Sequence, residues 1–259
     1  MIQRKCKIIS VINQKGGVGK TITSINLATA LAIFDKRILL IDLDPQGNLS
    51  TGIGIINRKQ NIYHLLTNLS NIHQVIQNTI ISNIEVIPSD QNLSALDTEA
   101  LTLKNKELIL NKQLNSVDQK KYDYIIIDCS PSLSLLTVNA LTASHSIIIP
   151  LQCEFFALEG VTNILKIVNY IKSDLNPHLS IEGILLTMFD RRNRLCKEIV
   201  DDVKKNFGSL VYNQLIPRNI KLSEATSYGQ PIMVYDSKCS GSIAYILLAQ
   251  EILKKHESL

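Results

Sequence analysis

The sequence predicts an α/β fold built on a doubly wound, mostly parallel sheet. Short runs rich in Ile, Leu and Val alternate along the chain with longer segments of helical periodicity. Several runs are almost continuously apolar, which is typical of strands buried on both faces of a parallel sheet. This alternation favours right-handed crossovers that place helices on both faces of the sheet.

The expected elements follow from this alternation. Apolar, β-branched runs predict strands at Ile8–Asn13, Arg37–Asp42, Ile84–Pro88, Tyr124–Asp128, Ser146–Leu151, Ile181–Thr187 and Leu210–Asn213. Longer periodic segments predict helices at Lys20–Phe34, Leu133–Ala143, Glu154–Ser173, Arg194–Phe207 and Ser242–Lys255. The Asn-rich stretch 57–83 has no clear period and can hold short helices. No linker-like or repeated segment interrupts the pattern, so we expect a single domain over residues 1–259.

The composition excludes several classes of protein. The cysteines are scattered and show no CxxC or Cys/His ligand spacing, which argues against structural zinc or an iron–sulfur cluster. No apolar run approaches the roughly 18 residues of a membrane span, and the N-terminus shows no secretory signal. We therefore expect a cytoplasmic protein. The net charge of +4 is too small to indicate nucleic acid by itself.

A glycine-rich loop separates the first expected strand from the first helix. It consists of Lys15, Gly16, Gly17, Val18, Gly19, Lys20 and Thr21. Glycines let backbone N–H groups approach phosphate oxygens, and the helix N-terminus attracts anions. Lys20 can contact the β- and γ-phosphates, and the Thr21 hydroxyl can bind Mg²⁺. The sequence therefore predicts a nucleoside triphosphate site with Mg²⁺, and hydrolysis there; a glycine turn without ligand is the alternative.

The loop departs from the ordinary phosphate-loop pattern at its first position. That pattern requires glycine where this chain has Gln14, and Lys15 follows at the head of the loop. Two ammonium groups in one loop need a counter-charge, and a triphosphate supplies one. The alternative is that Lys15 extends into solvent.

Three aspartates follow two of the expected buried strands. Asp42 and Asp44 end the second strand, and Asp128 ends the strand Tyr124–Asp128. Ligands of open α/β sheets bind beyond the carboxyl ends of the strands, so these carboxylates can converge on the loop. We expect Asp128 to serve Mg²⁺. Of Asp42 and Asp44, which lie on the same side of the strand, one can serve the Mg²⁺ shell and the other can orient the attacking water. A turn or helix-cap role is the alternative for each aspartate.

These motifs together resemble the deviant Walker A ATPases, and within them the ParA/Soj partition ATPases. The resemblance rests on GGVGKT preceded by Lys15, on LLIDLDPQGN, and on YIIIDCSPSL at Asp128. Three further stretches agree with it: IIIPLQCEFFALEG at 147–160, EGILLTMFDRRNRL at 182–195 and LIPRNIKLSEATSYGQPIMVYD at 215–236. The match runs from about residue 7 to the last residue.

The resemblance implies a cycle driven by ATP and Mg²⁺. Binding of ATP allows two monomers to form a homodimer around two nucleotides, with Lys15 reaching the partner's phosphates. The dimer binds double-stranded DNA without sequence preference, so the protein would be nucleoid-associated. A ParB/Spo0J-type protein then stimulates hydrolysis and release, and the cycle segregates replicons.

The resemblance also implies roles for individual residues. The catalytic residues would be Lys15, Lys20 and Asp44, and the metal site would comprise Thr21, Asp42 and Asp128. The nucleotide would contact Lys15, Gly16, Gly17, Val18, Gly19, Lys20, Thr21, Ile22, Met188, Pro217, Arg218 and Asn219. Ile22 stands where the family usually has threonine, so a hydroxyl contact to the α-phosphate is lost and weaker affinity is expected. Ser130 and Thr226 replace usual prolines, with effects left open.

Basic residues cluster after the expected strand Ile181–Thr187. Arg191, Arg192, Arg194 and Lys197 crowd one short stretch. Such crowding suits phosphate contacts without sequence readout, although a solvated loop is an equal alternative from the residues alone. The resemblance favours DNA, and the expected contacts are Arg191, Arg192, Arg218 and Lys221. Which residue of the 191/192 pair makes the contact is left open.

The main alternative is a MinD-like ATPase that cycles on the membrane. That class should end in a short amphipathic helix with a Lys-rich face, whereas Ser242–Leu259 is rich in Ile, Leu and Ala and indicates a core-packed helix. A nitrogenase-reductase-like electron donor would need a pair of cysteines to hold a cluster between subunits, and Cys129 has no suitably placed second cysteine. A metabolic ligase would need a polar substrate pocket that the sequence does not reveal. The absence of an Asn-Lys-x-Asp sequence disfavours GTP.

Overall fold

The strands form a single mostly parallel sheet in the computed structural model, which describes residues 6–100, 103–118, 120–154 and 157–257. The sheet order is β3-β4-β2-β5-β1-β6-β7, and only the β3–β4 pair is antiparallel. The strands are β1 Lys7–Val11, β2 Ile38–Leu43, β3 Gln77–Asn78, β4 Ile84–Ile87, β5 Tyr124–Cys129, β6 Ser146–Gln152 and β7 Ser180–Thr187. The central position of β1 places the loop that follows it at the middle of the carboxyl edge.

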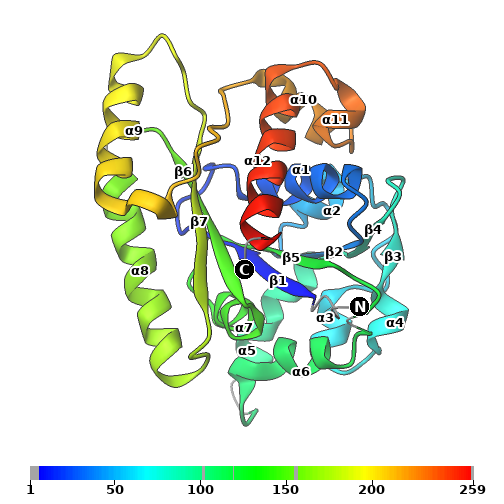
Figure 1. Cartoon of the computed structure of the whole chain (residues 1–259). Coiled ribbons are helices and arrows are strands. Elements are labelled where there is room, and N and C mark those ends of the chain that lie inside the picture. The colour runs from blue at the N-terminus through cyan, green and yellow to red at the C-terminus, as the bar shows by residue number, and fades with distance from the viewer. Residues whose placement is uncertain (1–5, 101–102, 119, 155–156, 258–259) are drawn as a thin grey trace.

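Helices cover both faces of this sheet (Figure 1). One face carries α1 (Lys20–Ile33), α2 (Asn48–Gly52), α10 (Ile220–Ser227), α11 (Ile232–Tyr235) and α12 (Ser240–Glu257). The other carries α3 (Ile62–Leu66), α4 (Ile72–Val75), α5 (Leu96–Glu99), α6 (Ile109–Asn115) and α7 (Leu135–Ala143), while α8 (Ala157–Asp174) and α9 (Arg194–Phe207) flank β6 and β7. Short 3-10 turns occur at Gln91–Ala95, Lys106–Leu108 and Gly208–Leu210. The predicted doubly wound fold is confirmed.

The central strands are buried on both faces because their side chains alternate between two hydrophobic clusters. Ile41 and Ile127 belong to the cluster under α7 and α8, whereas Leu40 and Ile126 belong to the cluster under α1 and α12. All four are fully buried. Period-two alternation therefore gives a continuous apolar run when both faces are covered by helices.

The Asn-rich stretch 57–83 contains two short helices, and asparagines begin both of them. The Asn61 side chain accepts hydrogen bonds from the backbone N–H groups of Tyr63 and His64 at the start of α3. Asn71 forms a capping box with Gln74 at the start of α4. Capping satisfies N–H groups that a first helical turn leaves without partners, so the asparagines mark helix starts.

The strand predicted at Leu210–Asn213 is wrong. Val211 makes only an isolated bridge to Ile184, and the chain next pairs with β7 at Ile216, whose N–H donates to the carbonyl oxygen of Leu186 (2.9 Å). The reason is a carboxylate on α12: Glu251 accepts hydrogen bonds from the backbone N–H groups of Asn213 (2.8 Å) and Gln214 (3.0 Å). Backbone donors held by a side chain cannot extend a strand ladder. The boundaries of the other predicted strands and helices shift by a few residues, and residues 155–156 of one predicted helix lie outside the described residues.

The last helix, α12, packs into the core through Tyr245, Leu248 and Ile252. Among the described residues, no helix combines the length and apolar character needed to cross a membrane. The far end of α12 is joined to β7 by Glu182, which is 3% exposed and lies 2.7 Å from Lys7 Nζ and 3.0 Å from His256 Nε2. Burial raises the pKa of Glu182, but hydrogen bonds from His256 and Lys7 outweigh burial and hold that pKa well below its usual range.

Replacing Glu182 by Gln should lower the free energy of unfolding by about 3 kcal/mol at neutral pH, because it removes the buried carboxylate with which Lys7 and Lys255 pair from the protein surface. A depressed folded-state pKa stabilises the protein above the unfolded value of roughly 4.3, and this contribution is lost as pH falls below it. Urea unfolding at neutral pH and near pH 3 should therefore show the difference from the natural protein shrinking in acid. Glu198→Gln removes an exposed pair with Arg194 and should change stability by less than about 1 kcal/mol; an equal loss in both variants would contradict the prediction.

Candidate functional site

The glycine-rich loop joins the end of β1 to the start of α1 at the carboxyl edge of the sheet. Gly17 and Gly19 adopt φ of 74° and 90°, a left-handed conformation that favours glycine. No side chain caps the N-terminus of α1, so its first N–H groups face the loop as anion donors. The Thr187 hydroxyl at the end of β7 donates to the carbonyl oxygen of Val18 (2.9 Å) and holds the loop against the sheet.

The two lysines of the loop have opposite environments. Lys20 is 7% exposed, and its ammonium donates to the carbonyl oxygen of Lys15 (3.1 Å) across the loop. Burial lowers the pKa of Lys20, and the nearby Asp128 opposes that change. The side chain of Lys15 is 52% exposed and forms an ion pair with Glu154, beyond the end of β6. Lys20 thus points into the loop, while Lys15 lies on the molecular surface.

Asp128 links the start of α1 to β5. Its carboxylate accepts hydrogen bonds from the hydroxyls of Thr21 (2.7 Å) and Ser24 (2.9 Å). It is 1% exposed, and burial, followed by the charge of Asp42, raises the pKa of Asp128 to about 8. A buried carboxylate beside a threonine hydroxyl is the hard-oxygen donor set that Mg²⁺ prefers. The predicted pair Thr21 and Asp128 therefore comes together and fits this ion.

Asp42 lies beside Asp128, since the two residues are register partners of β2 and β5. Its Oδ2 atom accepts hydrogen bonds from the backbone N–H (2.8 Å) and hydroxyl (2.6 Å) of Ser50. Burial raises the pKa of Asp42 to about 6, although the bonds from Ser50 lower it. In this structure the carboxylate binds Ser50 in α2. Its assignment as a metal ligand stays a prediction.

Asp44 occupies the tight turn between β2 and α2. It is 7% exposed, and its Oδ1 accepts a hydrogen bond from the backbone N–H of Gln46 (3.0 Å). The turn is closed by the N–H of Gly47, which donates to the carbonyl oxygen of Asp44 (2.9 Å). The carboxylate therefore follows the same strand as Asp42, at the edge where the loop lies.

Four of the predicted nucleotide-contacting residues, Met188, Pro217, Arg218 and Asn219, lie at or beside a short stretch of backbone pairing. Phe189 N–H donates to the Ile216 carbonyl oxygen (3.0 Å), and Arg218 N–H donates to that of Phe189 (3.0 Å). Met188 precedes this ladder with φ of 53°, a strained conformation for a residue other than glycine. Asn219 caps α10 and also donates to the Ser240 hydroxyl (3.0 Å). Met188, Pro217 and Asn219 thus surround one short ladder beyond β7.

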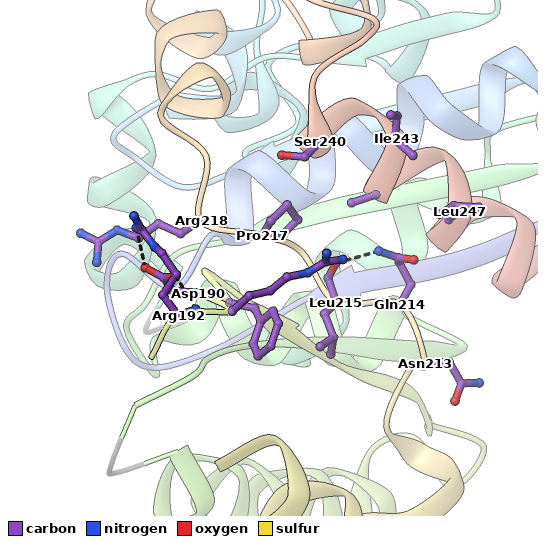
Figure 2. A pocket seen from close by; sticks show the side chains of 13 residues that line it. Asp190, Arg192, Asn213, Gln214, Leu215, Pro217, Arg218, Ser240, Ile243 and Leu247 are labelled. Atoms are coloured by element: carbon purple, nitrogen blue, oxygen red, sulfur yellow. Dashed lines mark hydrogen bonds and ion pairs between the residues drawn. The ribbon is translucent and has the colours of Figure 1, made fainter. Parts of the chain in front are cut away.

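The basic residues line a separate open pocket of about 830 Å³ (Figure 2). Arg191, Arg192 and Arg218 contribute to it, and Ile243 and Leu247 of α12 form an apolar wall. No residue of the phosphate loop lines this pocket. The phosphate loop is therefore not part of this pocket, although Pro217 and Arg218, two of the predicted nucleotide-contacting residues, line it.

The predicted DNA-contacting residues differ in their partners. Arg192 makes two side-chain hydrogen bonds to Asp190 (3.1 and 3.0 Å), and these bonds lower the pKa of Asp190 to about 2. Lys221 forms an ion pair with Asp236. Among the described residues, no carboxylate pairs with Arg191 or Arg218. Arg191 and Arg218 therefore carry the positive charges of this surface that form no ion pair among the described residues, although the charge of Arg218 also lowers the pKa of Asp190.

Two residues of the site were not predicted. Ser24 shares Asp128 with Thr21, and their spacing of one helical turn is a signal that could have identified it. Glu154, the partner of Lys15, follows β6 and could not be found, because only the folded sheet brings β6 beside β1.

Two of the departures from the family pattern have clear surroundings in the structure. Ile22 packs against a hydrophobic cluster, and the Ser130 hydroxyl forms a hydrogen bond with that of Ser132 (2.9 Å).

Comparison with known proteins agrees with this geometry. A family model described as an AAA domain matches residues 6–181. The chain is 45% identical over 252 residues to the chromosome partitioning protein ParA of Caulobacter vibrioides, covering 96% of this chain and 94% of that protein. It is 47% identical over 248 residues to the sporulation initiation inhibitor protein Soj of Bacillus subtilis, with 95% and 98% covered. The crystal structure of a cobyrinic acid a,c-diamide synthase from Mycobacterium smegmatis, with bound ADP and magnesium, matches with a TM-score of 0.86 and 31% identity, covering 98% of this chain and 96% of that one. The chain therefore belongs to the ParA/Soj family of chromosome-partitioning ATPases.

Proposed function

We propose that this chain is a DNA-partitioning ATPase whose ATP-bound homodimer binds double-stranded DNA without sequence preference. The observation that carries the proposal is the loop at the end of β1, with Lys20 buried inside it and Lys15 exposed at its head. A ParB-type protein stimulates hydrolysis and releases the dimer from DNA. This cycle would make the protein cytoplasmic and nucleoid-associated, and it accords with the names of its relatives.

The nucleotide is ATP, held with Mg²⁺. The loop N–H groups and Lys20 bind the phosphates, while Thr21 and Asp128 hold the cation. Bound Mg²⁺ neutralises charge that develops on the phosphate oxygens during transfer. The magnesium and ADP in the related Mycobacterium smegmatis structure support this assignment.

Asp44 orients the attacking water. It lies on the turn that leaves β2, one strand from Asp128 across the sheet, and its second carboxylate oxygen has no hydrogen-bond partner among the described residues. A carboxylate held by one oxygen keeps the other available to accept a proton or a hydrogen bond from water.

Lys15 contacts the phosphates of the partner subunit. Its only ion pair within the described residues is with Glu154, and both side chains are substantially exposed. Exposed ion pairs contribute about 0–1 kcal/mol, so a triphosphate can replace Glu154 at small energetic expense. Dimerisation would then depend on bound nucleotide.

DNA binds on the basic surface formed by Arg191, Arg192, Arg218 and Lys221. Arg191 and Arg218 are exposed and have no carboxylate partner among the described residues, so they contribute most to phosphate contact. Asp190 and Asp236 offset the charges of Arg192 and Lys221. Phosphate contacts of this kind carry no base information and weaken with salt.

Lys20→Ala should weaken ATP binding by on the order of 100-fold, because it removes a buried charge-assisted contact to phosphate. Titration with a fluorescent ATP analogue and Mg²⁺ measures the change. Lys112→Ala, an exposed lysine on α6, should bind as the natural protein does. Unchanged affinity in Lys20→Ala would remove the loop assignment.

Asp44→Ala should slow phosphate release by on the order of 100-fold or more while leaving ATP affinity intact, because it removes the group that orients water. The variant should also accumulate as an ATP-bound dimer on DNA, which analytical ultracentrifugation with DNA can detect. A normal turnover rate would exclude Asp44 from catalysis.

Arg218→Glu should abolish ATP-dependent binding to non-specific duplex DNA and leave the ATP-dependent dimer intact. Arg218→Ala should reduce the slope of log K against log salt by about 0.9 if one phosphate contact is lost. Lys172→Glu makes the same charge change at the exposed end of α8 and should bind DNA almost normally. Loss of the dimer in Arg218→Glu would mean that the residue is structural, and a flat salt response in the natural protein would contradict DNA binding.

A further inference from the structure

The turn that carries Asp44 depends on a close approach at Gly47. Gly47 has φ of 62°, and a Cβ atom there would lie 2.5 Å from Nη1 of Arg58 and 2.9 Å from the carbonyl oxygen of Ser89. The guanidinium of Arg58 therefore lies directly against the backbone of this turn. A side chain at position 47 would displace it or collide with fixed backbone.

Arg58 sends its three donor nitrogens to three different segments. Nε donates to the carbonyl oxygen of Ile55 (3.2 Å), Nη1 to that of Ser89 (3.4 Å), and Nη2 to the hydroxyl of Thr51 (2.7 Å). These acceptors lie after α2, after β4 and within α2. The Thr51 hydroxyl in turn donates to the carbonyl oxygen of Gly47 (3.1 Å), so the arginine reaches the Asp44 turn through one intervening side chain.

A second chain of hydrogen bonds joins Asp42, two residues before Asp44, to Ser50 and Ser89. The hydroxyl of Ser50 donates to Asp42 (2.6 Å) and accepts a hydrogen bond from the backbone N–H of Ser89 (3.0 Å). Asp42, Ser50 and Ser89 are all completely buried. Arg58 closes this path into a ring by binding the Ser89 carbonyl oxygen. The buried bonds that Ser50 makes to Asp42 and to the Ser89 backbone favour one conformation. Thr51 is exposed, and the Ser89 hydroxyl has no partner among the described residues.

We propose that Arg58 is a positioning residue for ATP hydrolysis, which keeps Asp44 in place by joining Thr51, Ser89 and the Gly47 backbone. The inference rests on the proposed role of Asp44. No carboxylate of the described residues pairs with Arg58, so its contribution comes from the geometry of its donors rather than from charge. A planar guanidinium reaches three acceptors in fixed directions, which an ammonium does not.

The test compares Arg58→Ala and Arg58→Lys with Lys59→Ala, the neighbouring exposed lysine. In the full chain with ATP and Mg²⁺, both Arg58 variants should lower kcat about tenfold, keep the Kd for ATP within about twofold, and keep the melting midpoint well above the assay temperature. Lys59→Ala should match the natural protein. Slow turnover in Arg58→Lys, which keeps the positive charge, would show that the geometry of the donors matters; normal turnover in that variant would overturn this part of the inference.

A double-mutant cycle with Thr51→Val tests the path. Thr51→Val alone should lower kcat, and adding it to Arg58→Ala should lower kcat little further, because both changes interrupt one chain of contacts. Additive effects would overturn the inference. A parallel loss of ATP affinity and of thermal stability in Arg58→Ala would also overturn it, because the residue would then be structural.

Asp44→Ala is measured beside these variants to separate the two proposals. Normal turnover in Asp44→Ala contradicts the catalytic role of Asp44, and with it the reason for holding the turn. Slow turnover in Asp44→Ala together with normal kcat in both Arg58 variants overturns the positioning role alone.

Discussion

The site depends on the hydrogen bonds that join the carboxylate of Asp128 to the start of α1. Asp128 ends β5, beside the strand that leads into the phosphate loop, and accepts hydrogen bonds from Thr21 and Ser24 of the following helix. A fully buried carboxylate needs such partners or a cation, because desolvation disfavours its charge. The same contact fixes the start of α1 against the sheet and places carboxylate and hydroxyl oxygens beside the phosphate loop, where the proposed function puts Mg²⁺. Asp128 therefore has both a structural role at the start of α1 and a proposed role in binding Mg²⁺.

Around this contact, the charged groups are held at different depths. Lys20 lies inside the loop, whereas Lys15 remains on the surface with an exposed partner. The proposed function assigns Lys20 to the nucleotide of its own subunit and Lys15 to that of the partner, and the exposed ion pair of Lys15 with Glu154 costs little to break. The basic surface lies apart from both lysines, in a pocket beside α12. In the proposed cycle, nucleotide binding would control dimerisation, and dimerisation would control contact with DNA.

The segment after β2 is supported by polar contacts as well as by the hydrophobic core, to which Leu49 and Ile53 contribute. Asp42 accepts hydrogen bonds from Ser50 of α2. Arg58 donates to Thr51 of α2 and to Ser89 after β4. Directional hydrogen bonds can hold a catalytic carboxylate within a narrow range of positions, which apolar packing alone does not specify. The contacts around this turn thus come from residues well separated in sequence, Ser50, Arg58 and Ser89.

The sequence by itself determined the sheet, the helices on both faces, the phosphate loop and the strand-end aspartates. These depend on local periodicity, on glycine at left-handed positions and on the parallel alignment of strands, all of which are visible in neighbouring residues. Only the tertiary structure decided that Glu251 ends the segment predicted as a strand at Leu210–Asn213, that Asp42 binds Ser50, and that Arg192 is paired while Arg191 is not. Each of these outcomes is a competition among donors and acceptors for partners, and most of those partners come close only when distant segments meet. Local patterns place a side chain on a face, but the folded chain determines which partner it finds there.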